Sequence, residues 1–235
     1  MARAGVPAPC DRPAGTTRAR PRGRAPPLPR PPPAGVPSPA RHHCAGADAR
    51  LTPPGARQAG LLGRRLAGLP LSSVAHGPLP RTTARAALVA AELGAGVPLT
   101  ELDAAGDYVP HVPSLQEIHA DHRAGVTAFL AGVSAEEQAR GAELAAEAIR
   151  RWTGAEAGEN DSHHLVVTHA FTIGWLVRHA CAAPPWRWLG LDSGHTALTV
   201  LRFSADRAPA VAVFNDMSHL PEELRWTGFP AGRRV

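Results

Sequence analysis

Residues 41–59 read RHHCAGADARLTPPGARQA, and the second half of this stretch carries the first signal of ordered structure. Thr52 has a side chain that caps helices, and Pro53 has the fixed φ that suits the first helical position. Apolar side chains then recur at helical spacing on one face: Leu61, Leu62 and Leu66. We therefore expect order to begin near residue 51, with a helix that packs against a core.

The segment before this helix has a different composition. Residues 1–40 are rich in proline, arginine, alanine and glycine. Their only large apolar side chains are Met1, Val6, Leu28 and Val36. Such a segment cannot bury enough apolar surface to offset the entropy of ordering it. We predict a disordered or extended tail over residues 1–40, a folded domain over 41–229 and a short C-terminal tail over 230–235.

The positive charge of the chain is concentrated at its start. The formal net charge is +5, and all 25 basic residues are arginine. Residues 1–50 hold nine arginines and two aspartates (+7), whereas the remaining residues hold 16 arginines and 18 acidic residues (−2). The folded part is therefore not expected to bind nucleic acid. The tail keeps an alternative role, because its charge alone can attract RNA or an acidic partner.

The cysteines and the apolar runs bear on the compartment. Three cysteines are scattered without a C-x-x-C spacing: Cys10, Cys44 and Cys181. They argue against a disulfide framework and fit a reducing cytoplasm. No apolar run reaches the roughly 18 residues of a membrane span, and no apolar signal-peptide core follows the arginine-rich start. We therefore expect a cytoplasmic protein without a membrane segment.

Segments with strand and helix signals alternate along the rest of the chain. Strands are expected over residues 71–76, 164–168, 196–203 and 210–214. Helices are expected over about residues 81–93, 114–131, 135–152 and 171–181. Residues 99–113 have the Gly, Pro and Asp content of a loop. This alternation predicts an α/β fold, a three-layer α/β/α sandwich with a mainly parallel sheet.

Two arginines and two histidines stand where strands of this sheet would end. Arg41 and Arg81 carry planar forks of donors that match phosphate oxygens, and α/β folds bind ligands at the carboxyl ends of their strands. A neutral imidazole at His42 can attack phosphorus and form a phosphohistidine. His169 can hydrogen-bond the phosphoryl oxygens as charge builds on them. The alternatives are surface arginines and a structural histidine at a strand end.

Several motifs in this order resemble the histidine phosphatase superfamily, in its phosphoglycerate mutase-like branch of small bacterial phosphatases. They are Arg41-His42, Leu51-Thr52 with Gly55 and Gln58-Ala59, Leu79-Pro80-Arg81-Thr82, Val166-Val167-Thr168-His169, and Phe214 to Pro221. The resemblance implies a phosphoglycerate mutase-like fold and a phosphohistidine enzyme that needs no metal or cofactor. In that enzyme His42 attacks, and Arg41, Arg81 and His169 hold the phosphoryl group, with His43 beside the substrate.

The resemblance also implies an acid that protonates the leaving oxygen, in the loop after the second helix. Three carboxylates qualify: Glu101, Asp103 and Asp107. Asp107 is our first choice because Gly106-Asp107-Tyr108-Val109-Pro110 is the most loop-like setting, and Glu101 is the second. For each of them a solvated loop carboxylate is the alternative.

Two features depart from the pattern of the family. His43 replaces the glycine that normally follows the nucleophile, although glycine allows a closer backbone approach. An apolar central strand should lead into Arg41, but residues 34–40 read AGVPSPA and contain two prolines. We infer either that the start of the chain is not that of an intact family member or that the first strand is missing or degraded.

The function expected from these observations is hydrolysis of small phosphorylated metabolites through a phosphohistidine. Two alternatives are a catalytically impaired relative that binds phosphorylated ligands, and a mutase of the phosphoglycerate type. A metal enzyme is a further alternative, because the chain contains the pairs His42-His43 and His163-His164. Adjacent residues on a strand point to opposite faces, however, and no partner for a metal site stands nearby. We expect no metal, and the sequence carries no signal for an oligomeric state.

Overall fold

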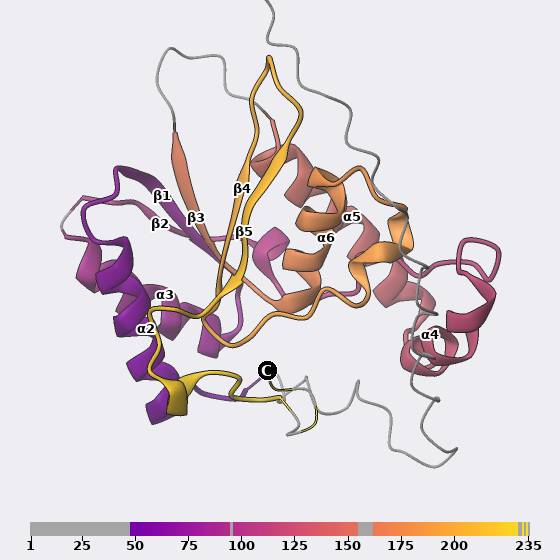
Figure 1. The fold of residues 1–235 in the computed structure, drawn as a ribbon, viewed down its shortest axis with the longest axis horizontal. Helices are drawn as coiled ribbons and strands as arrows, with labels where there is room; N and C mark the ends of the chain where they lie inside the picture. The colour runs from indigo at the N-terminus through magenta and orange to yellow at the C-terminus, as the bar shows by residue number, and fades with distance from the viewer. Residues whose placement is uncertain (1–47, 95, 155–161, 230–231, 233, 235) are drawn as a thin grey trace, which may run out of the picture. The chain divides into compact units, whose positions relative to one another are not determined.

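Helices cover both faces of a central layer of strands, as the computed structural model in Figure 1 shows. The structure describes residues 48–94, 96–154 and 162–229, together with residues 232 and 234. All of them belong to one unit that spans residues 37–235. The predicted tail over residues 1–40 lies outside the described residues.

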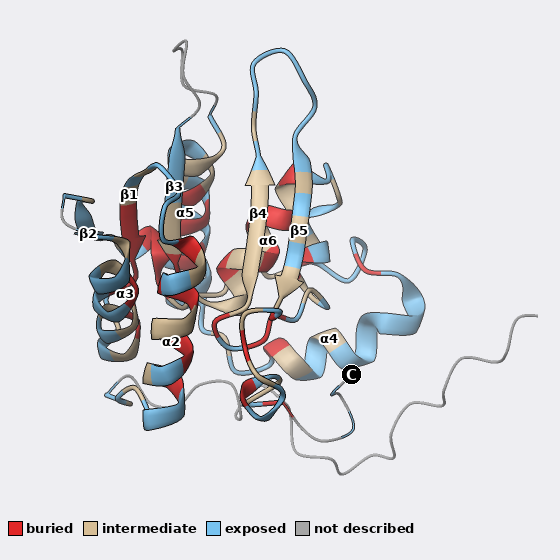
Figure 2. Cartoon of the chain, turned by 60° about the vertical axis from the view of Figure 1, so that its left-hand side comes forward, coloured by how far each residue is buried: buried red, intermediate tan, exposed pale blue. Residues whose placement is uncertain are grey.

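A parallel three-stranded sheet forms one part of the central layer. Strand β1 (Leu71–His76) lies between β2 (Leu99–Glu101) and β3 (His163–Val167), and both neighbours run parallel to it. Val74 on β1 is opposite Leu99 on β2 and Leu165 on β3. Figure 2 shows β1 as the most buried of the three strands, β2 as exposed, and β3 as exposed only at its start. The carboxyl ends of β1 and β3 therefore meet at one edge of the sheet.

A second sheet continues the layer. Strands β4 (Leu198–Arg202) and β5 (Ala210–Asp216) form an antiparallel pair that is not hydrogen-bonded to β3. β4 follows β3 across the layer in both views (Figures 1 and 2). Leu165 of β3 and Leu198 of β4 pack against the same apolar cluster. The predicted α/β fold is confirmed, but over the described residues the layer consists of two sheets rather than one.

Helices α2 (Pro53–Leu66) and α3 (Pro80–Leu93) cover one face of the layer. Thr52 caps α2 as predicted, since its hydroxyl accepts the amide hydrogen of Gly55. Four fully or nearly fully buried residues join the two helices: Ala59, Leu62, Leu66 and Val89. A second cluster, of Val74, Ala86 and Val167, joins α3 to β1 and β3.

Helices α5 (Ala135–Trp152) and α6 (Ala170–Ala180) cover the other face. α5 begins at a complete capping box, in which the Ser134 hydroxyl and the Glu137 carboxylate each accept the backbone N–H of the other residue. The buried faces of α5 and α6 both pack against the 3₁₀-helix η1 (Asp103–Ala105). The apolar cluster at this contact contains Ala104 from η1, Ala148 from α5 and Leu176 from α6. This completes the three layers.

Two predicted segments differ from the structure. The predicted loop over residues 99–113 contains β2 and η1. The predicted helix over residues 114–131 is helical only in η2 (Ala120–His122) and α4 (Arg123–Leu130), because a turn precedes it. In that turn the Glu117 carboxylate accepts hydrogen bonds from the backbone N–H and the hydroxyl of Ser114. α4 is exposed along most of its length (Figure 2).

The C-terminal segment is anchored on α2 by Gln58. Its side-chain amide donates to the carbonyl of Leu224 at 2.8 Å and to the hydroxyl of Thr227 at 2.9 Å. Gln58 is 2% exposed, so the amide needs these partners. A Cβ on Gly55, one turn earlier, would come within 2.7 Å of the Leu51 side chain. The Gly55, Gln58 and Ala59 motif therefore serves packing at this helix.

Candidate active site

The candidate site lies at the carboxyl ends of β1 and β3, where two helices begin. Arg81 is the second residue of α3, and His169 is the N-cap residue of α6. No side chain caps the first turn of either helix. Helix N-termini carry partial positive charge from their unpaired amide groups, so this edge of the sheet attracts anions.

Asp107 brings the two predicted residues together. Its carboxylate oxygen Oδ2 accepts a hydrogen bond from Nη2 of Arg81 at 3.2 Å and lies 3.5 Å from Nδ1 of His169. The three side chains are only 16%, 20% and 14% exposed, in the order Arg81, Asp107 and His169. Three residues that are far apart in the sequence thus form one partly buried cluster of charged and titratable groups.

The protonation of His169 follows from its surroundings. Burial lowers the pKa of this imidazole, nearby Arg81 and Arg85 lower it further, and only Asp107 acts in the opposite direction. The ring is therefore neutral at neutral pH. Nε2 lies 3.2 Å from the hydroxyl of Thr82, which can donate to it, whereas the carboxylate beside Nδ1 can only accept. This arrangement favours the tautomer with its proton on Nδ1.

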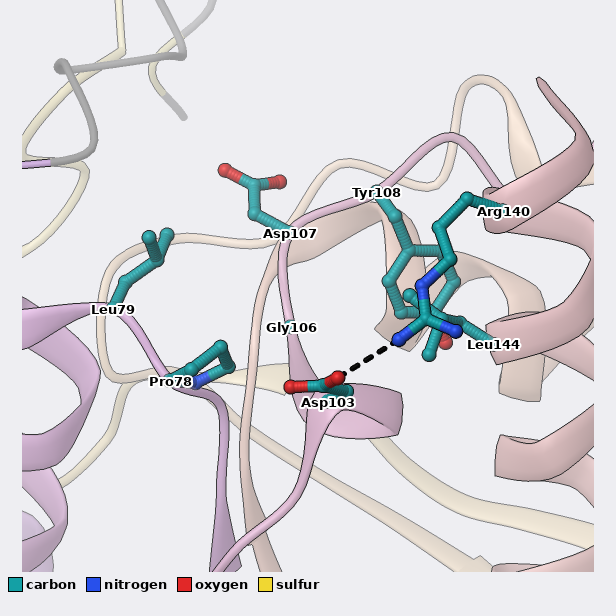
Figure 3. Close-up of a pocket in the computed structure, with 8 residues that line it drawn as sticks. All are labelled: Pro78, Leu79, Asp103, Gly106, Asp107, Tyr108, Arg140 and Leu144. Carbon is teal, nitrogen blue, oxygen red and sulfur yellow. Dashed lines mark hydrogen bonds and ion pairs between the residues drawn. The ribbon is translucent and has the colours of Figure 1, made fainter. Parts of the chain in front are cut away.

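The three candidate acids occupy different places. Asp103 is 59% exposed and forms an ion pair with Arg140 at 2.8 Å. Figure 3 shows Asp103 turned toward Arg140, whereas the carboxylate of Asp107 points to the other side of the loop. Glu101 is exposed at the end of β2. Of the three, only Asp107 meets Arg81 and His169, and its role as the acid stays a prediction.

A shallow cavity of about 230 Å³ lies beside this loop. Asp103, Asp107 and Tyr108 line it from the loop, and Arg140 and Leu144 line it from α5 (Figure 3). Burial raises the pKa of Tyr108 to about 12, and its hydroxyl donates to the carbonyl of Ala104. Tyr108 therefore stays neutral and supports the backbone of the loop.

The remaining predicted site residues are Arg41, His42 and His43, and they lie outside the described residues. The structure therefore places four of the seven predicted site residues, and the position of the predicted nucleophile stays a prediction. The described parts of the chain contain no group of three or more His, Cys, Asp or Glu side chains that could hold a metal ion. No helix within those parts is long and apolar enough to span a membrane.

Two further residues position the Asp107 loop, and the sequence did not point to them. Thr172 is fully buried on α6, and its hydroxyl donates to the carbonyl of Gly106 at 2.9 Å. Gly77 follows β1, and a Cβ there would come within 2.5 Å of the carbonyl oxygen of Ala105. In the sequence, the feature that could have pointed to Thr172 is its position three residues after His169 in the same predicted helix.

A family model matches this chain. It describes the histidine phosphatase superfamily (branch 1), and the match covers residues 38–216, which is more than half of the chain. The chain is also 26% identical over 189 residues to the mitochondrial serine/threonine-protein phosphatase PGAM5 of Mus musculus. That match covers 78% of this chain and 62% of the mouse protein, so the chain spans less than two thirds of the length of this relative.

Several solved structures have a similar fold. One is YhfR of Bacillus stearothermophilus, with a TM-score of 0.56, 19% identity and coverage of 76% of this chain and 91% of the other. Another is the phosphoserine phosphatase of Entamoeba histolytica in complex with 3-phosphoglyceric acid, with a TM-score of 0.53, 17% identity and coverage of 76% and 89%. At these identities the likeness concerns the fold alone.

Proposed function

Since the chain belongs to the histidine phosphatase superfamily (branch 1), we propose that it hydrolyses small phosphomonoesters through a phosphohistidine at His42. The observation that carries this proposal is the cluster of Arg81, Asp107 and His169 at the carboxyl edge of the sheet. It combines a guanidinium that can bind phosphate, a neutral imidazole that can donate a hydrogen bond, and a carboxylate that can exchange a proton.

Each of these groups has a distinct part in the proposed reaction. Arg81 and the N-terminal turns of α3 and α6 bind the negative phosphoryl oxygens. His169, with its proton on Nδ1, donates a hydrogen bond to one of these oxygens. An incoming phosphate competes with Asp107 for the same donors. In this proposal Asp107 takes up a proton from solvent as the phosphoryl group binds, which removes the repulsion between the two anions and supplies the proton for the leaving oxygen.

The proposed chemistry has two steps. A nitrogen of His42 attacks phosphorus while the bond from phosphorus to the ester oxygen breaks, and Asp107 gives its proton to the departing alcohol. Water then attacks the phosphohistidine and gives a proton to Asp107. Inorganic phosphate leaves, and both side chains return to their starting states. No metal takes part in this scheme.

The substrate class rests on similar proteins and on the setting of the site. The chain is similar to a phosphoserine phosphatase crystallised with 3-phosphoglyceric acid, and to a serine/threonine-protein phosphatase. A small phosphorylated substrate is our first proposal because Arg81, Asp107 and His169 are largely buried. A mutase of the phosphoglycerate type is the less supported alternative. We propose the cytoplasm as the compartment, from the scattered cysteines of the sequence.

A turnover assay on p-nitrophenyl phosphate tests the proposal. The wild type should release p-nitrophenolate with and without a chelator, and His42→Ala should abolish the release. His119→Ala is the matched control, because His119 is an exposed histidine that pairs with Asp121. Turnover that needs a metal would contradict the metal-free scheme, and full activity of His42→Ala would exclude His42 as the nucleophile.

Binding without turnover is the second candidate function. It is favoured by the sequence before Arg41, because residues 34–40 contain two prolines and almost no large apolar side chains that could form a central strand. Phosphoryl transfer depends on accurate positioning, so a nucleophile without a strand behind it would be poorly held. A folded wild type that binds inorganic phosphate but does not turn over p-nitrophenyl phosphate would establish this candidate and exclude the first.

A further inference from the structure

Arg85 is a second arginine on the side of α3 that carries Arg81. The two residues are four positions apart, and residues at this spacing lie one above the other on a helix. Side chains on a helix lean toward its N-terminus, which here is the end at the candidate site. An arginine is long enough to reach across the single turn, about 5.4 Å, that separates it from Arg81. Arg85 also acts electrostatically on His169.

Arg85 is half-buried, and no carboxylate among the described residues pairs with its guanidinium. Its Nε is inaccessible to solvent and has no hydrogen-bond partner there, and no ion pair joins it to a carboxylate. Burial lowers the pKa of the guanidinium, and the like charge of Arg81 lowers it further. Arginine nevertheless stays charged in proteins. An uncompensated charge of this kind is costly, so a purely structural arginine would be expected to have a partner.

Another arginine in the same helix pair shows what a structural role looks like. Arg64 on α2 forms an ion pair with Glu92 on α3 at 2.9 Å and is 57% exposed. Near the candidate site, the arginines are not matched by an equal number of carboxylates. Asp107 is the described carboxylate that pairs with Arg81 and His169, and the charges of Arg81 and Arg85 both act on His169. The described part of the site therefore carries two arginines for one carboxylate.

We propose that Arg85 is a second phosphate-binding arginine on α3, in addition to Arg81 and the predicted Arg41, and that it donates to non-bridging oxygens of the phosphoryl group bound at Arg81 and His169. This inference depends on one part of the proposed function, namely that the candidate site binds a phosphoryl group. Two guanidinium groups on one dianion would distribute its charge over donors that are already in place. Arg85 would then determine the preference of the site for a dianionic phosphoryl group over a singly charged one.

Binding of inorganic phosphate, measured by isothermal titration calorimetry, tests the proposal without requiring turnover. Arg85→Met keeps much of the length of the side chain and removes its charge, and it should weaken phosphate binding roughly ten- to a hundredfold, as expected for a charge-assisted hydrogen bond. Arg85→Lys keeps the charge without the fork and should fall between Arg85→Met and the wild type. Arg64→Met, the control, should bind phosphate as the wild type does.

Thermal unfolding separates a binding role from a structural one. Without phosphate, Arg85→Met should melt at the wild-type temperature or above it, because the substitution removes an unpaired charge whose Nε is shielded from solvent. With phosphate, Arg85→Met should gain less stability than the wild type. Unchanged phosphate binding in Arg85→Met and Arg85→Lys would overturn the proposal, as would a wild type that binds no phosphate. Phosphate binding that depends on Arg85 in a wild type without turnover would support this inference and contradict the proposed hydrolysis.

Discussion

Asp107 is the residue through which the candidate site is assembled, because Arg81 from α3 and His169 from α6 both meet its carboxylate. If Asp107 protonates the leaving oxygen, its importance must depend on the leaving group. An alkoxide leaves only with a proton, whereas p-nitrophenolate leaves readily without one. This difference allows the role of the acid to be separated from a role in binding.

We therefore expect Asp107→Asn to lower kcat/KM for glycerol 2-phosphate by roughly 10² to 10⁴. The loss for p-nitrophenyl phosphate should be clearly smaller, and steady-state kinetics on both substrates would measure the two losses. Asp103→Asn is the matched control, because Asp103 lies on the same loop and pairs with Arg140 instead. Equal losses on both substrates, or a loss in the control, would argue against Asp107 as the acid.

His169 links the site to the pH dependence of stability. Its pKa is lowered in the folded state, chiefly by burial, so the unfolded chain binds a proton at higher pH than the folded chain does. The free energy of unfolding should therefore fall as the pH drops below about 6.5, the ordinary histidine value. Above that pH both states are neutral at this ring, and the effect is absent.

Urea unfolding at pH 7.5 and pH 5.5 measures this effect. One histidine contributes at most about 1.4 kcal/mol per pH unit. His179 and His219 also have lowered pKa values because of burial, so the wild type should lose stability from several rings. His169→Gln should lose less between the two pH values than the wild type. A loss equal to that of the wild type would mean that His169 does not titrate as inferred.

At the residue scale, the sequence predicted the members of the cluster but not their supports. Arg81, Asp107 and His169 were identified from motifs, and the structure brings them together. Thr82 was noted only as part of a motif, and its contact with His169 was not predicted; Arg85 was not identified at all. Both roles depend on the end of β3 lying beside α3. That neighbourhood is a consequence of strand order, which local patterns do not contain.

At the scale of elements, helices with local signals were predicted well. Thr52 and the capping box at Ser134 mark the starts of α2 and α5 in both the sequence and the structure. β2 was missed, because its three residues are all exposed and carry no alternating pattern. Its conformation comes from pairing with β1, which the amino-acid types at residues 99–101 do not encode.

The contact between the end of β1 and the Asp107 loop offers a prediction at this scale. In Gly77→Ala, the new Cβ would come within 2.5 Å of the carbonyl oxygen of Ala105, so the loop must shift. We expect a destabilisation of about 1–3 kcal/mol in urea unfolding. Because the shifted loop carries Asp107, kcat/KM should also fall for the folded variant.

Gly125→Ala is the control for this substitution. Gly125 lies inside α4, and a Cβ there would meet nothing within 4 Å. Alanine is the better helix former, so this variant should gain about 0.5–1 kcal/mol and keep its activity. If Gly77→Ala were as stable and as active as the wild type, the close packing of β1 against the loop would not hold the site together.

At the scale of the whole molecule, the number of layers was predicted, whereas the separation of β4 and β5 from β3 over the described residues was foreseen only as a first strand that is missing or degraded. The alternation of strands and helices determines which faces must be covered, and α2 and α3 on one side and α5 and α6 on the other cover them. The separation of β4 and β5 from β3 depends on hydrogen bonding between strands that are distant in the sequence. Periodicity along one strand carries no information about its neighbour.

The uneven charge of the chain leads to the last prediction, which concerns deletion of residues 1–35. These residues hold seven arginines and one aspartate, a charge of +6, so the shortened chain carries −1 instead of +5. If the segment is a tail without a core of its own, its removal should change the melting temperature by less than about 2 °C, which corresponds to under about 1 kcal/mol. Phosphate binding should be unchanged, and retention on a heparin column should fall sharply because that retention depends on the arginines. A large fall in melting temperature would instead mean that these residues contribute to the fold. The edges of β3 and β4 that pair with no strand of the described residues would then be the first place to look for their contact.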